Sequence, residues 1–259
     1  MKLEACNVVV RFGGVVAVDD VSVALAPGRI VSVVGPNGSG KSTLFNAITG
    51  LVPMAQGEVR IDGRSLLDLP MNKRVRRGIS RTFQTPRFDP DMTVRETVLC
   101  GYFPLRRTGL LAVCLQTSAA RREAAEMHDR CDALLESFGL AAYARTPMSD
   151  LPIGQIRLVD VARAAAAQPQ YLLLDEPAAG LTTAEQTMLS NEVRRVAASG
   201  VGVLLVEHNF ELVCQLAEHL IVLERGRMLL EGTPDVVSAD PFFRRAYLGV
   251  TEELEGAAA

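Results

Sequence analysis

The sequence of 259 residues predicts an α/β fold around a parallel β-sheet, and two observations support this prediction. Residues 171–174 and 201–206 are almost continuous apolar runs, which are typical of parallel strands buried on both faces. Between these runs, Thr182 and Glu185 have the spacing of a capping box, which marks the start of a helix that would end near Gly200. A helix between two such strands is the usual crossover connection of a parallel sheet.

The N-terminal part predicts an antiparallel β layer. Residues 2–34 alternate apolar and polar side chains, with turn signals at residues 13–14 and 27–28. Residues 57–63 add a short strand. The basic residues between 73 and 81 favour a solvated helix face over a dedicated anion site.

Helical patterns begin at about residue 90. Apolar side chains between Met127 and Phe138 fall on one stripe, and Gly139 follows as a stop signal. Such a stripe is typical of a helix that packs on a core. Residues 219–231 then predict a last pair of strands, and residues 250–259 predict a frayed end.

The composition indicates a globular protein with 48% hydrophobic residues. The net charge of −3 argues against a broad basic surface, so we expect no nucleic-acid partner. No apolar run approaches the roughly 18 residues that a membrane-spanning helix needs, and we expect the chain in the cytosol unless a partner holds it to a membrane. The five cysteines are scattered without a C-x-x-C spacing, which indicates neither a disulfide framework nor a zinc site.

A glycine-rich loop joins the apolar strand predicted at 30–34 to a helix that starts near Lys41. Its pattern, G-x-x-x-x-G-K-S, can fold backbone N–H groups around a phosphate chain. Lys41 would add a positive charge and Ser42 a hydroxyl for Mg²⁺. The alternative, a turn that merely joins two elements, is disfavoured because strand, loop and helix agree. The candidate nucleotide-binding residues are Gly35, Pro36, Asn37, Gly38, Ser39, Gly40, Lys41, Ser42 and Thr43.

Two acidic residues, Asp175 and Glu176, end the apolar strand predicted at 171–174. Ligands of parallel α/β sheets bind beyond the carboxyl ends of the strands, so both acids should emerge beside the glycine-rich loop. Asp175 would hold Mg²⁺ through water, and Glu176 would accept the proton of the attacking water. Without the loop, a capping or surface role would be the better interpretation. Together with the loop, the two acids predict a nucleoside triphosphatase.

These motifs and four others resemble the ATP-binding cassette (ABC) ATPases over nearly the whole chain. In chain order they are residues 35–43 (Walker A), 82–84 (glutamine loop), 150–155 (signature), 172–176 (Walker B), 178–181 (D-loop) and 206–209 (switch histidine). The resemblance implies a P-loop NTPase core with an antiparallel β subdomain and an inserted helical lobe. It divides the chain into residues 1–86 (β layer and P-loop part of the core), 87–166 (helical lobe ending in the signature), 167–249 (remainder of the core) and 250–259 (flexible tail).

The resemblance also implies the roles of single residues. Gln84 would contact the γ-phosphate and Mg²⁺, and His208 would hydrogen-bond the γ-phosphate. Phe12 would stack on adenine, with a core position as its alternative. The implied catalytic residues are Glu176, His208 and Gln84; the implied cofactors are ATP and Mg²⁺, the metal held by Ser42, Gln84 and, through water, Asp175.

Finer features resemble the larger ATP-binding subunit of branched-chain amino-acid importers. They are residues 12–18, 81–86, an extended helical segment at 101–144, residues 175–181, 206–209 and the ending at 245–249. The resemblance implies a peripheral ATPase on the cytoplasmic face of the cell membrane, with integral permease subunits, a second ABC ATPase subunit and, indirectly, an external solute-binding protein. Urea, aromatic or other organic acids and other amino acids remain alternative cargoes. A soluble P-loop NTPase is a less satisfactory alternative, because it does not explain the series of motifs. An ABC ATPase that acts on DNA or ribosomes is also less satisfactory, because such proteins usually carry two cassettes and this chain has one.

Two departures and one apolar segment refine the expected partners. The stretch Leu151-Pro152-Ile153-Gly154-Gln155 lacks the usual serine and first glycine of the signature, and Thr182-Thr183 replaces an Asn-Pro pair. Pro152 offers neither a hydroxyl nor an N–H, so the site that Leu151, Gly154 and Gln155 help to build on a partner should be weakened, which predicts a heterodimer of cassettes.

The permease should contact Gln84 and residues 86–99, where Phe88, Met92 and Val94 are apolar; packing under the helical lobe is the alternative.

Overall fold

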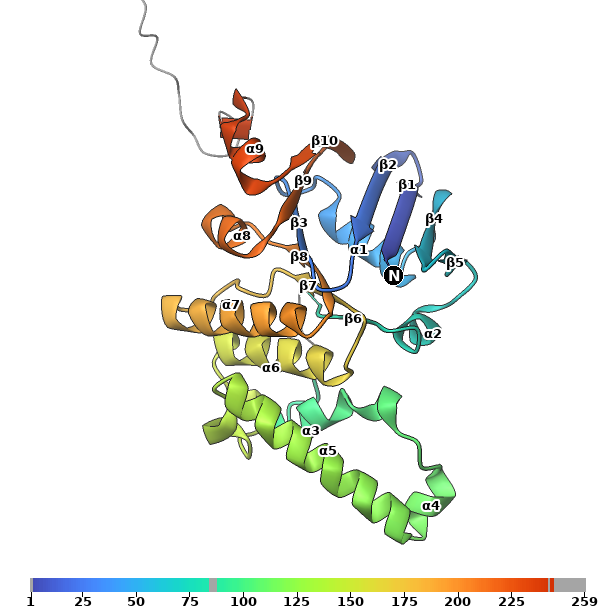
Figure 1. The fold of residues 1–259 in the computed structure, drawn as a ribbon, viewed down its shortest axis with the longest axis vertical. Helices are drawn as coiled ribbons and strands as arrows, with labels where there is room; N and C mark the ends of the chain where they lie inside the picture. Colours follow the sequence, from blue (N-terminus) through green and yellow to red (C-terminus); the bar gives the residue numbers. More distant parts are fainter. Residues whose placement is uncertain (1, 84–87, 242, 245–259) are drawn as a thin grey trace, which may run out of the picture.

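The computed structural model describes residues 2–83, 88–241 and 243–244 (Figure 1). The predictions for Gln84, for residues 85–86, for the ending at 245–249 and for the tail at 250–259 therefore lie outside the described residues. The described chain contains two β-sheets and a set of helices, and the predicted α/β architecture is confirmed.

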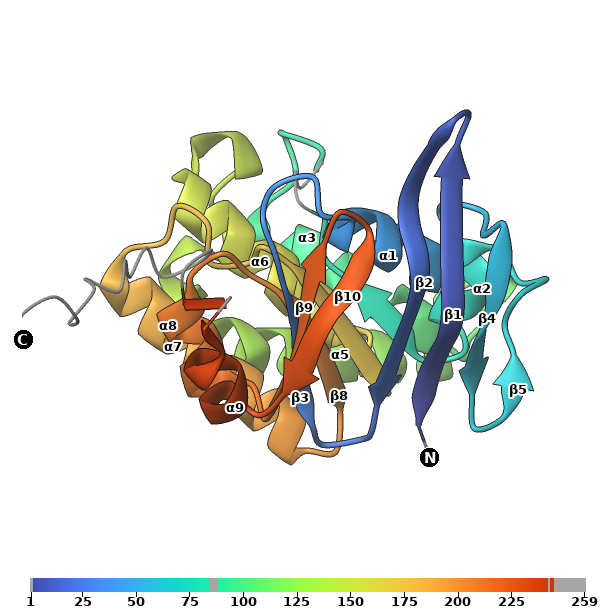
Figure 2. The same ribbon diagram turned by 90° about the horizontal axis from the view of Figure 1, so that it is seen from above.

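The first sheet is antiparallel and has the strand order β2-β1-β4-β5. Its strands are β1 (Leu3–Phe12), β2 (Val15–Leu25), β4 (Gln56–Ile61) and β5 (Arg64–Ser65). It lies beside helix α1 (Lys41–Thr49), which covers its inner face (Figure 2). The alternating pattern of residues 2–34 thus belongs to one long hairpin and to the first strand of the second sheet.

The second sheet has the order β10-β9-β3-β8-β7-β6 and carries the site. Its strands are β3 (Ile30–Val34), β6 (Ile79–Arg81), β7 (Tyr171–Asp175), β8 (Gly202–Val206), β9 (His219–Glu224) and β10 (Arg227–Gly232). Neighbouring strands are parallel except for β10, which pairs with β9 as an antiparallel hairpin.

Alternate residues of the central strands serve two different cores. In β7, Leu172 and Leu174 join the core under the helices, whereas Tyr171 and Leu173 join the core shared with α1 and the antiparallel sheet. Because both faces are buried at residues 171–174, each of these positions takes an apolar side chain, which explains the continuous run in the sequence.

Helices cover the opposite face of this sheet from α1. Those next to the strands are α6 (Ile153–Ala166), α7 (Thr183–Ala198), α8 (Phe210–Leu216) and α9 (Pro234–Ala239). The predicted capping box is present: the Thr182 hydroxyl accepts from the Glu185 N–H, and the Glu185 carboxylate accepts from the Thr182 N–H.

A helical lobe stands below α6 and α7 in Figure 1. It contains α3 (Val94–Cys100), α4 (Leu110–Cys114) and α5 (Ser118–Ser137), with single 3₁₀ turns at Phe103–Leu105, Ala141–Tyr143 and Met148–Asp150. The predicted stripe faces the core, with Cys131, Leu135 and Phe138 buried. Gly139 ends the helix at a φ of 66°, a conformation that favours glycine.

Two expectations from the sequence need correction. The basic stretch around α2 (Met71–Val75) is a solvated face at Lys73, Arg76 and Arg77, but not at Arg74 and Arg81, which are buried. Arg74 donates to the carbonyl oxygens of residues 47, 48 and 69, and so satisfies acceptors at the end of α1.

The second correction concerns the apolar residues that we expected near the permease. Val94 is fully buried in the core, and Phe88 packs partly buried against it, as the alternative interpretation proposed.

Among the described helices, none combines the length and apolarity that crossing a bilayer requires.

Candidate nucleotide-hydrolysis site

The loop of residues 35–43, called the phosphate loop below, connects β3 directly to α1. Gly35 and Gly40 have φ values of 157° and 103°, and a Cβ atom on either would meet a backbone oxygen, Leu223 O at 2.3 Å or Ala17 O at 2.5 Å. Only glycine therefore lets the loop pass between these neighbouring strands. Gly40 is also the N-cap of α1, so the N–H groups of the first helical turn open towards the loop.

The ammonium group of Lys41 lies within the phosphate loop. It donates to the carbonyl oxygens of Gly35 at 2.7 Å and Pro36 at 2.9 Å, and the residue is only 5% exposed. Burial lowers the pKa of Lys41, while the carboxylates of Glu176 and Asp175 oppose this shift. The cation is thus held by weak carbonyl acceptors, which a phosphate group could replace with a stronger partner.

The register of the sheet brings the predicted acids to the phosphate loop. Asp175 of β7 pairs with Val206 of β8, and Val206 pairs with Val33 of β3. The carboxyl ends of these three strands are therefore level, and residues that follow them in the chain meet at one edge of the sheet. Glu176 and His208 are two of these residues.

Glu176 and His208 form a close contact at this edge. The Glu176 Oε1 and the His208 Nε2 are 2.6 Å apart, and the histidine side chain remains 42% exposed. Glu176 has a φ of 50°, and its N–H donates to Val206 O, which fixes the turn after β7 to the neighbouring strand. The carboxylate is thus positioned by two strands, at the end of the sheet where a phosphate chain would lie.

A third acid at this edge, Glu207, was missed by the sequence reasoning. It is buried, and its carboxylate accepts from the N–H of Ala178 at 2.7 Å and from the N–H of His208 at 3.2 Å. Burial raises its pKa, which these N–H donors oppose. Glu207 therefore joins the loop after β7 to the loop after β8. Its only signal in the sequence is its place between the apolar run that ends at Val206 and His208.

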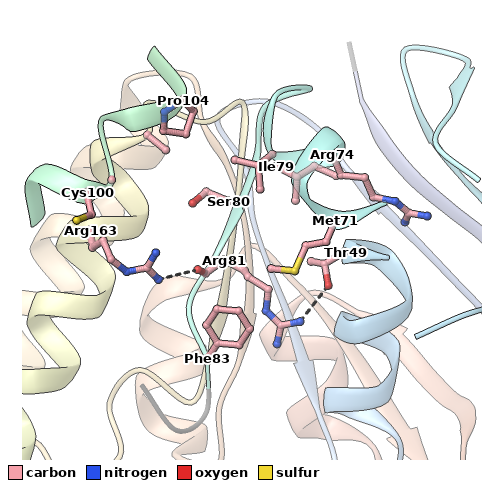
Figure 3. A pocket seen from close by; sticks show the side chains of 13 residues that line it. Thr49, Met71, Arg74, Ile79, Ser80, Arg81, Phe83, Cys100, Pro104 and Arg163 are labelled. Carbon is pink, nitrogen blue, oxygen red and sulfur yellow. Dashed lines mark hydrogen bonds between the residues drawn. The ribbon is translucent and has the colours of Figure 1, made fainter. Parts of the chain in front are cut away.

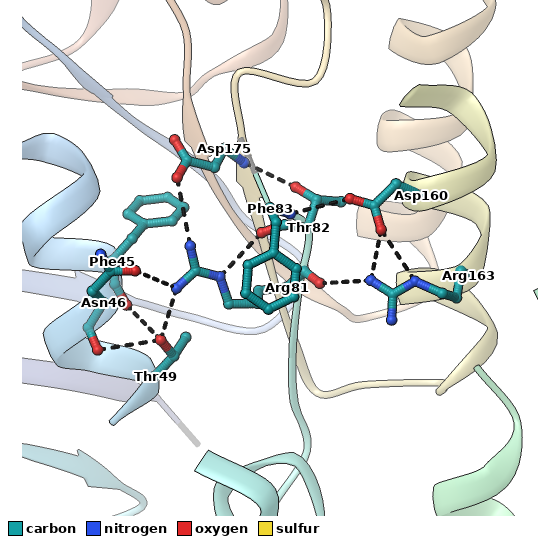
Figure 4. Close-up of polar contacts among 9 residues, drawn as sticks. All are labelled: Phe45, Asn46, Thr49, Arg81, Thr82, Phe83, Asp160, Arg163 and Asp175. Carbon is teal, nitrogen blue, oxygen red and sulfur yellow. Dashed lines mark hydrogen bonds and ion pairs between the residues drawn. The ribbon is translucent and has the colours of Figure 1, made fainter. Parts of the chain in front are cut away.

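Asp175 is 2% exposed and has Arg81 as its charged neighbour (Figure 4). Arg81 Nη2 lies 3.5 Å from Asp175 Oδ2, and its Nη1 donates to Asn46 Oδ1 at 2.8 Å and to Thr49 Oγ1 at 3.0 Å. Burial raises the pKa of Asp175, and the guanidinium counteracts this. Within the described residues Asp175 Oδ1 has no hydrogen-bond partner, so one carboxylate oxygen is left to receive a further donor or a hydrated cation.

The segment around Arg81 is also fixed to helix α6. Asp160 Oδ2 accepts from the N–H of Phe83 at 3.1 Å, and Arg163 donates to Asp160 Oδ1 at 2.6 Å (Figure 4). Arg163 also lies 3.5 Å from the carbonyl oxygen of Arg81. Residues 81–83 therefore lie between α1 and α6, and they directly precede Gln84 in the chain.

A cavity of about 110 Å³ opens beside this segment (Figure 3). Met71 and Ile79 line it from the core, Arg163 from α6 and Cys100 from the helical lobe, and Phe83 lies at its edge. The cavity thus lies between the core and the helical lobe, beside Phe83 of the predicted glutamine loop.

The remaining predicted site residues lie at two other places. Phe12 is 51% exposed at the end of β1, so the alternative of a core position is wrong, and its stacking on adenine stays a prediction. In the predicted signature, Leu151 is buried, Gly154 packs against Leu181 and Glu185, and Gln155 donates to Glu185 at 2.8 Å.

The exposed residues of the signature are Asp150, Pro152 and Ile153. Pro152 is the N-cap of α6 and makes no side-chain capping hydrogen bond. Contact of this region with a partner cassette stays a prediction.

The fold and this edge of the sheet define the class of the protein: it is a P-loop ATPase. Comparison with known proteins narrows the class, and the chain belongs to the ABC transporter family, which matches residues 18–179. The resemblance inferred from the motif series is confirmed, and with it ATP hydrolysis coupled to transport.

Two curated relatives cover almost the whole chain. It is 36% identical to the high-affinity branched-chain amino acid transport ATP-binding protein BraF of Pseudomonas aeruginosa, over 95% of this chain and 97% of the relative. It is 37% identical to the protein LivG of the same description from Escherichia coli K12, with the same coverage. Among solved structures, the ADP conformation of MJ1267, an ATP-binding cassette of an ABC transporter, has a TM-score of 0.81 and 31% identity, over 96% of this chain and 100% of that chain.

Proposed function

We propose that this chain is the ATPase subunit of an importer for branched-chain amino acids. The observation that carries the proposal is the identity of 36% to 38% with transport ATP-binding proteins of that description, over nearly the full length of both partners. The subunit would lie on the cytoplasmic face of the membrane, bound to permease subunits and served indirectly by an external solute-binding protein.

In this proposal, the phosphate loop and Lys41 bind the phosphate chain of ATP, and Phe12 stacks on the adenine. Ser42, Gln84 and, through water, Asp175 would hold Mg²⁺, which would neutralise phosphate charge during hydrolysis. The fit is supported by the buried Asp175 Oδ1, which has no partner among the described residues. Gln84 enters only through the resemblance, since it lies outside the described residues.

Glu176 would accept the proton of the attacking water, and His208 would bind the γ-phosphate. Their 2.6 Å contact supports this pairing, because the histidine can orient the carboxylate until a γ-phosphate provides the ring with another acceptor. The His208 side chain is 42% exposed, which leaves space for that acceptor.

The permease would dock at the cavity between the core and the helical lobe. Its walls come from both parts, and Phe83 at its edge precedes the predicted glutamine loop. A permease segment seated there would contact both the strand that ends beside Asp175 and the helix that follows the signature. The signature of this chain would contact the ATP bound to a partner cassette, where Pro152 is a poor replacement for the usual serine. We therefore expect a second, different cassette, whose signature would complete the ATP site of this chain.

Transport in proteoliposomes tests the proposal. The chain, reconstituted with its permease subunits, should drive ATP-dependent uptake of labelled leucine, and Lys41→Ala should abolish both ATP binding and uptake. If urea or an aromatic acid accumulates and leucine does not, the proposed cargo is wrong, but the ATPase assignment remains. ATP hydrolysis without any association with membrane subunits would overturn the transport assignment itself.

A further inference from the structure

The segment of residues 103–122, called the lobe tip below, presents exposed leucines at the far end of the helical lobe. It runs from the 3₁₀ turn after α3, through α4, to the start of α5, and α4 lies away from both sheets in Figure 1. Leu110 and Leu111 are each 80% exposed and Leu115 is 76% exposed, more than any other large apolar side chain described. Leucines at this exposure contribute nothing to the core of the chain.

The lobe tip is also strongly basic. Its 20 residues contain four arginines and no acidic residue, although the whole chain has a net charge of −3. The arginines lie on both sides of α4: Arg106 and Arg107 precede it, and Arg121 and Arg122 follow it, the last three being exposed. Exposed leucines between two pairs of arginines match a surface that is negatively charged outside and apolar inside, such as an anionic lipid bilayer.

Hydrogen bonds hold the lobe tip in a defined shape. Glu123 of α5 accepts from the N–H of Arg107 at 2.7 Å and from both the N–H and the hydroxyl of Thr108. Thr117 caps α5 by accepting from the N–H of Ala120. The leucines between these two anchors are therefore exposed in a tip that is fixed at both ends.

We propose that the lobe tip binds the surface of an anionic lipid bilayer. The arginines would bind lipid phosphates, and Leu110, Leu111 and Leu115 would enter the boundary between head groups and acyl chains. A protein partner fits less well, because the most exposed apolar side chains of the lobe tip are three leucines, which offer far less apolar area than the core of a specific interface that buries about 800 Å² on each side. The inference goes beyond the proposed function: it concerns a second contact with the membrane, made by side chains around α4 and not by the permease cavity, which the lobe tip lines only at Pro104.

Vesicle flotation of the full-length protein tests the proposal. The chain should float with vesicles of phosphatidylglycerol and phosphatidylcholine, should not float with phosphatidylcholine alone, and should be released by salt. Arg121→Gln with Arg122→Gln should weaken binding about thirtyfold, since each arginine near an anionic surface contributes about 1 kcal/mol. Leu110→Ser with Leu111→Ser should weaken it at least about tenfold.

Matched variants elsewhere on the surface serve as controls. Leu67→Ser with Val236→Ser, and Arg64→Gln with Arg145→Gln, remove the same kinds of exposed side chain and should float like the parent protein. ATP hydrolysis and thermal unfolding of all four double variants should match the parent, which separates this test from the proposed function. Failure of the parent to float, equal flotation with neutral vesicles, or tip variants that lose the permease instead of the lipid would each overturn the proposal.

Discussion

The buried pair of Arg81 and Asp175 allows a quantitative prediction. Arg81→Met preserves most of the side-chain volume but removes the guanidinium from Asp175, Asn46 and Thr49. The side chains of the pair are 5% and 2% exposed, so solvent cannot replace the lost partner. Breaking one side of such a pair costs about 3–5 kcal/mol, a large part of the roughly 5–15 kcal/mol that stabilises a typical protein.

Thermal unfolding followed by circular dichroism measures this loss. One kcal/mol lowers the unfolding temperature of a chain of this size by about 2–4 °C, so the variant should unfold roughly 6–20 °C below the parent. Arg77→Met, an exposed arginine of the same stretch, is the matched control and should change the temperature very little. Removing the charge of the partner as well, in Arg81→Met with Asp175→Asn, should recover part of the stability.

The pH dependence of the loss has a definite sign. Burial already raises the pKa of Asp175, and Arg81 is the main group that lowers it, so the pKa should rise further in Arg81→Met. Once pH falls below that pKa, the carboxyl group is neutral and no unpaired charge is buried. The stability difference between variant and parent should therefore shrink as pH falls. An Arg81→Met protein as stable as Arg77→Met, or a loss that grows towards acid pH, would refute this reasoning.

Three further outcomes follow from the structure. Glu176→Gln should keep ATP binding but lower the hydrolysis rate about 10²- to 10⁴-fold, the usual contribution of a general base; radiolabelled ATP turnover checks this, and a normal rate would assign the base elsewhere. Pro152→Ser should accelerate the ATPase of the isolated chain, which should otherwise be slow until partner and permease are added; equal rates for the parent chain, the variant and the full complex would exclude a weakened signature. Burial raises the pKa of Cys131 to about 11, so iodoacetamide at pH 8 should label the exposed Cys114 first, with Cys131 reacting only on unfolding, as peptide mass spectrometry would show; early labelling of Cys131 would contradict its burial.

The sequence was sufficient to predict the framework of the site. The phosphate loop, the acids after β7 and the residues after β8 follow apolar strands, and topology rules place the ends of parallel strands together. These predictions needed only local patterns, since glycine, apolar runs and capping residues act within a few positions of the chain. The contact of Glu176 with His208 needed the register of three strands, which only the structure provides.

The interactions of the buried charges could not be predicted in the same way. Arg74 and Arg81 look like members of a solvated basic run, but their acceptors in α1 lie 26 to 35 residues away in the chain, and the carboxylate that pairs with Arg81 lies still further away. Glu207 likewise accepts from an N–H that lies 29 residues earlier. A sequence shows that such a group carries charge, but not which distant carbonyl or amide surrounds it after folding.

The position of β3 in its sheet has a consequence for synthesis of the protein. This strand carries the phosphate loop, yet its neighbours on either side are β8 and β9, which end at residues 206 and 224. While the ribosome is still making the first 200 residues, β3 has neither of the partners that hold it in place. The phosphate loop of the nascent chain therefore lacks its neighbouring strands until β8 and β9 have been made, and we expect nucleotide binding only after residue 224 has emerged. Binding of ATP would then distinguish chains that contain both neighbours of β3 from shorter ones.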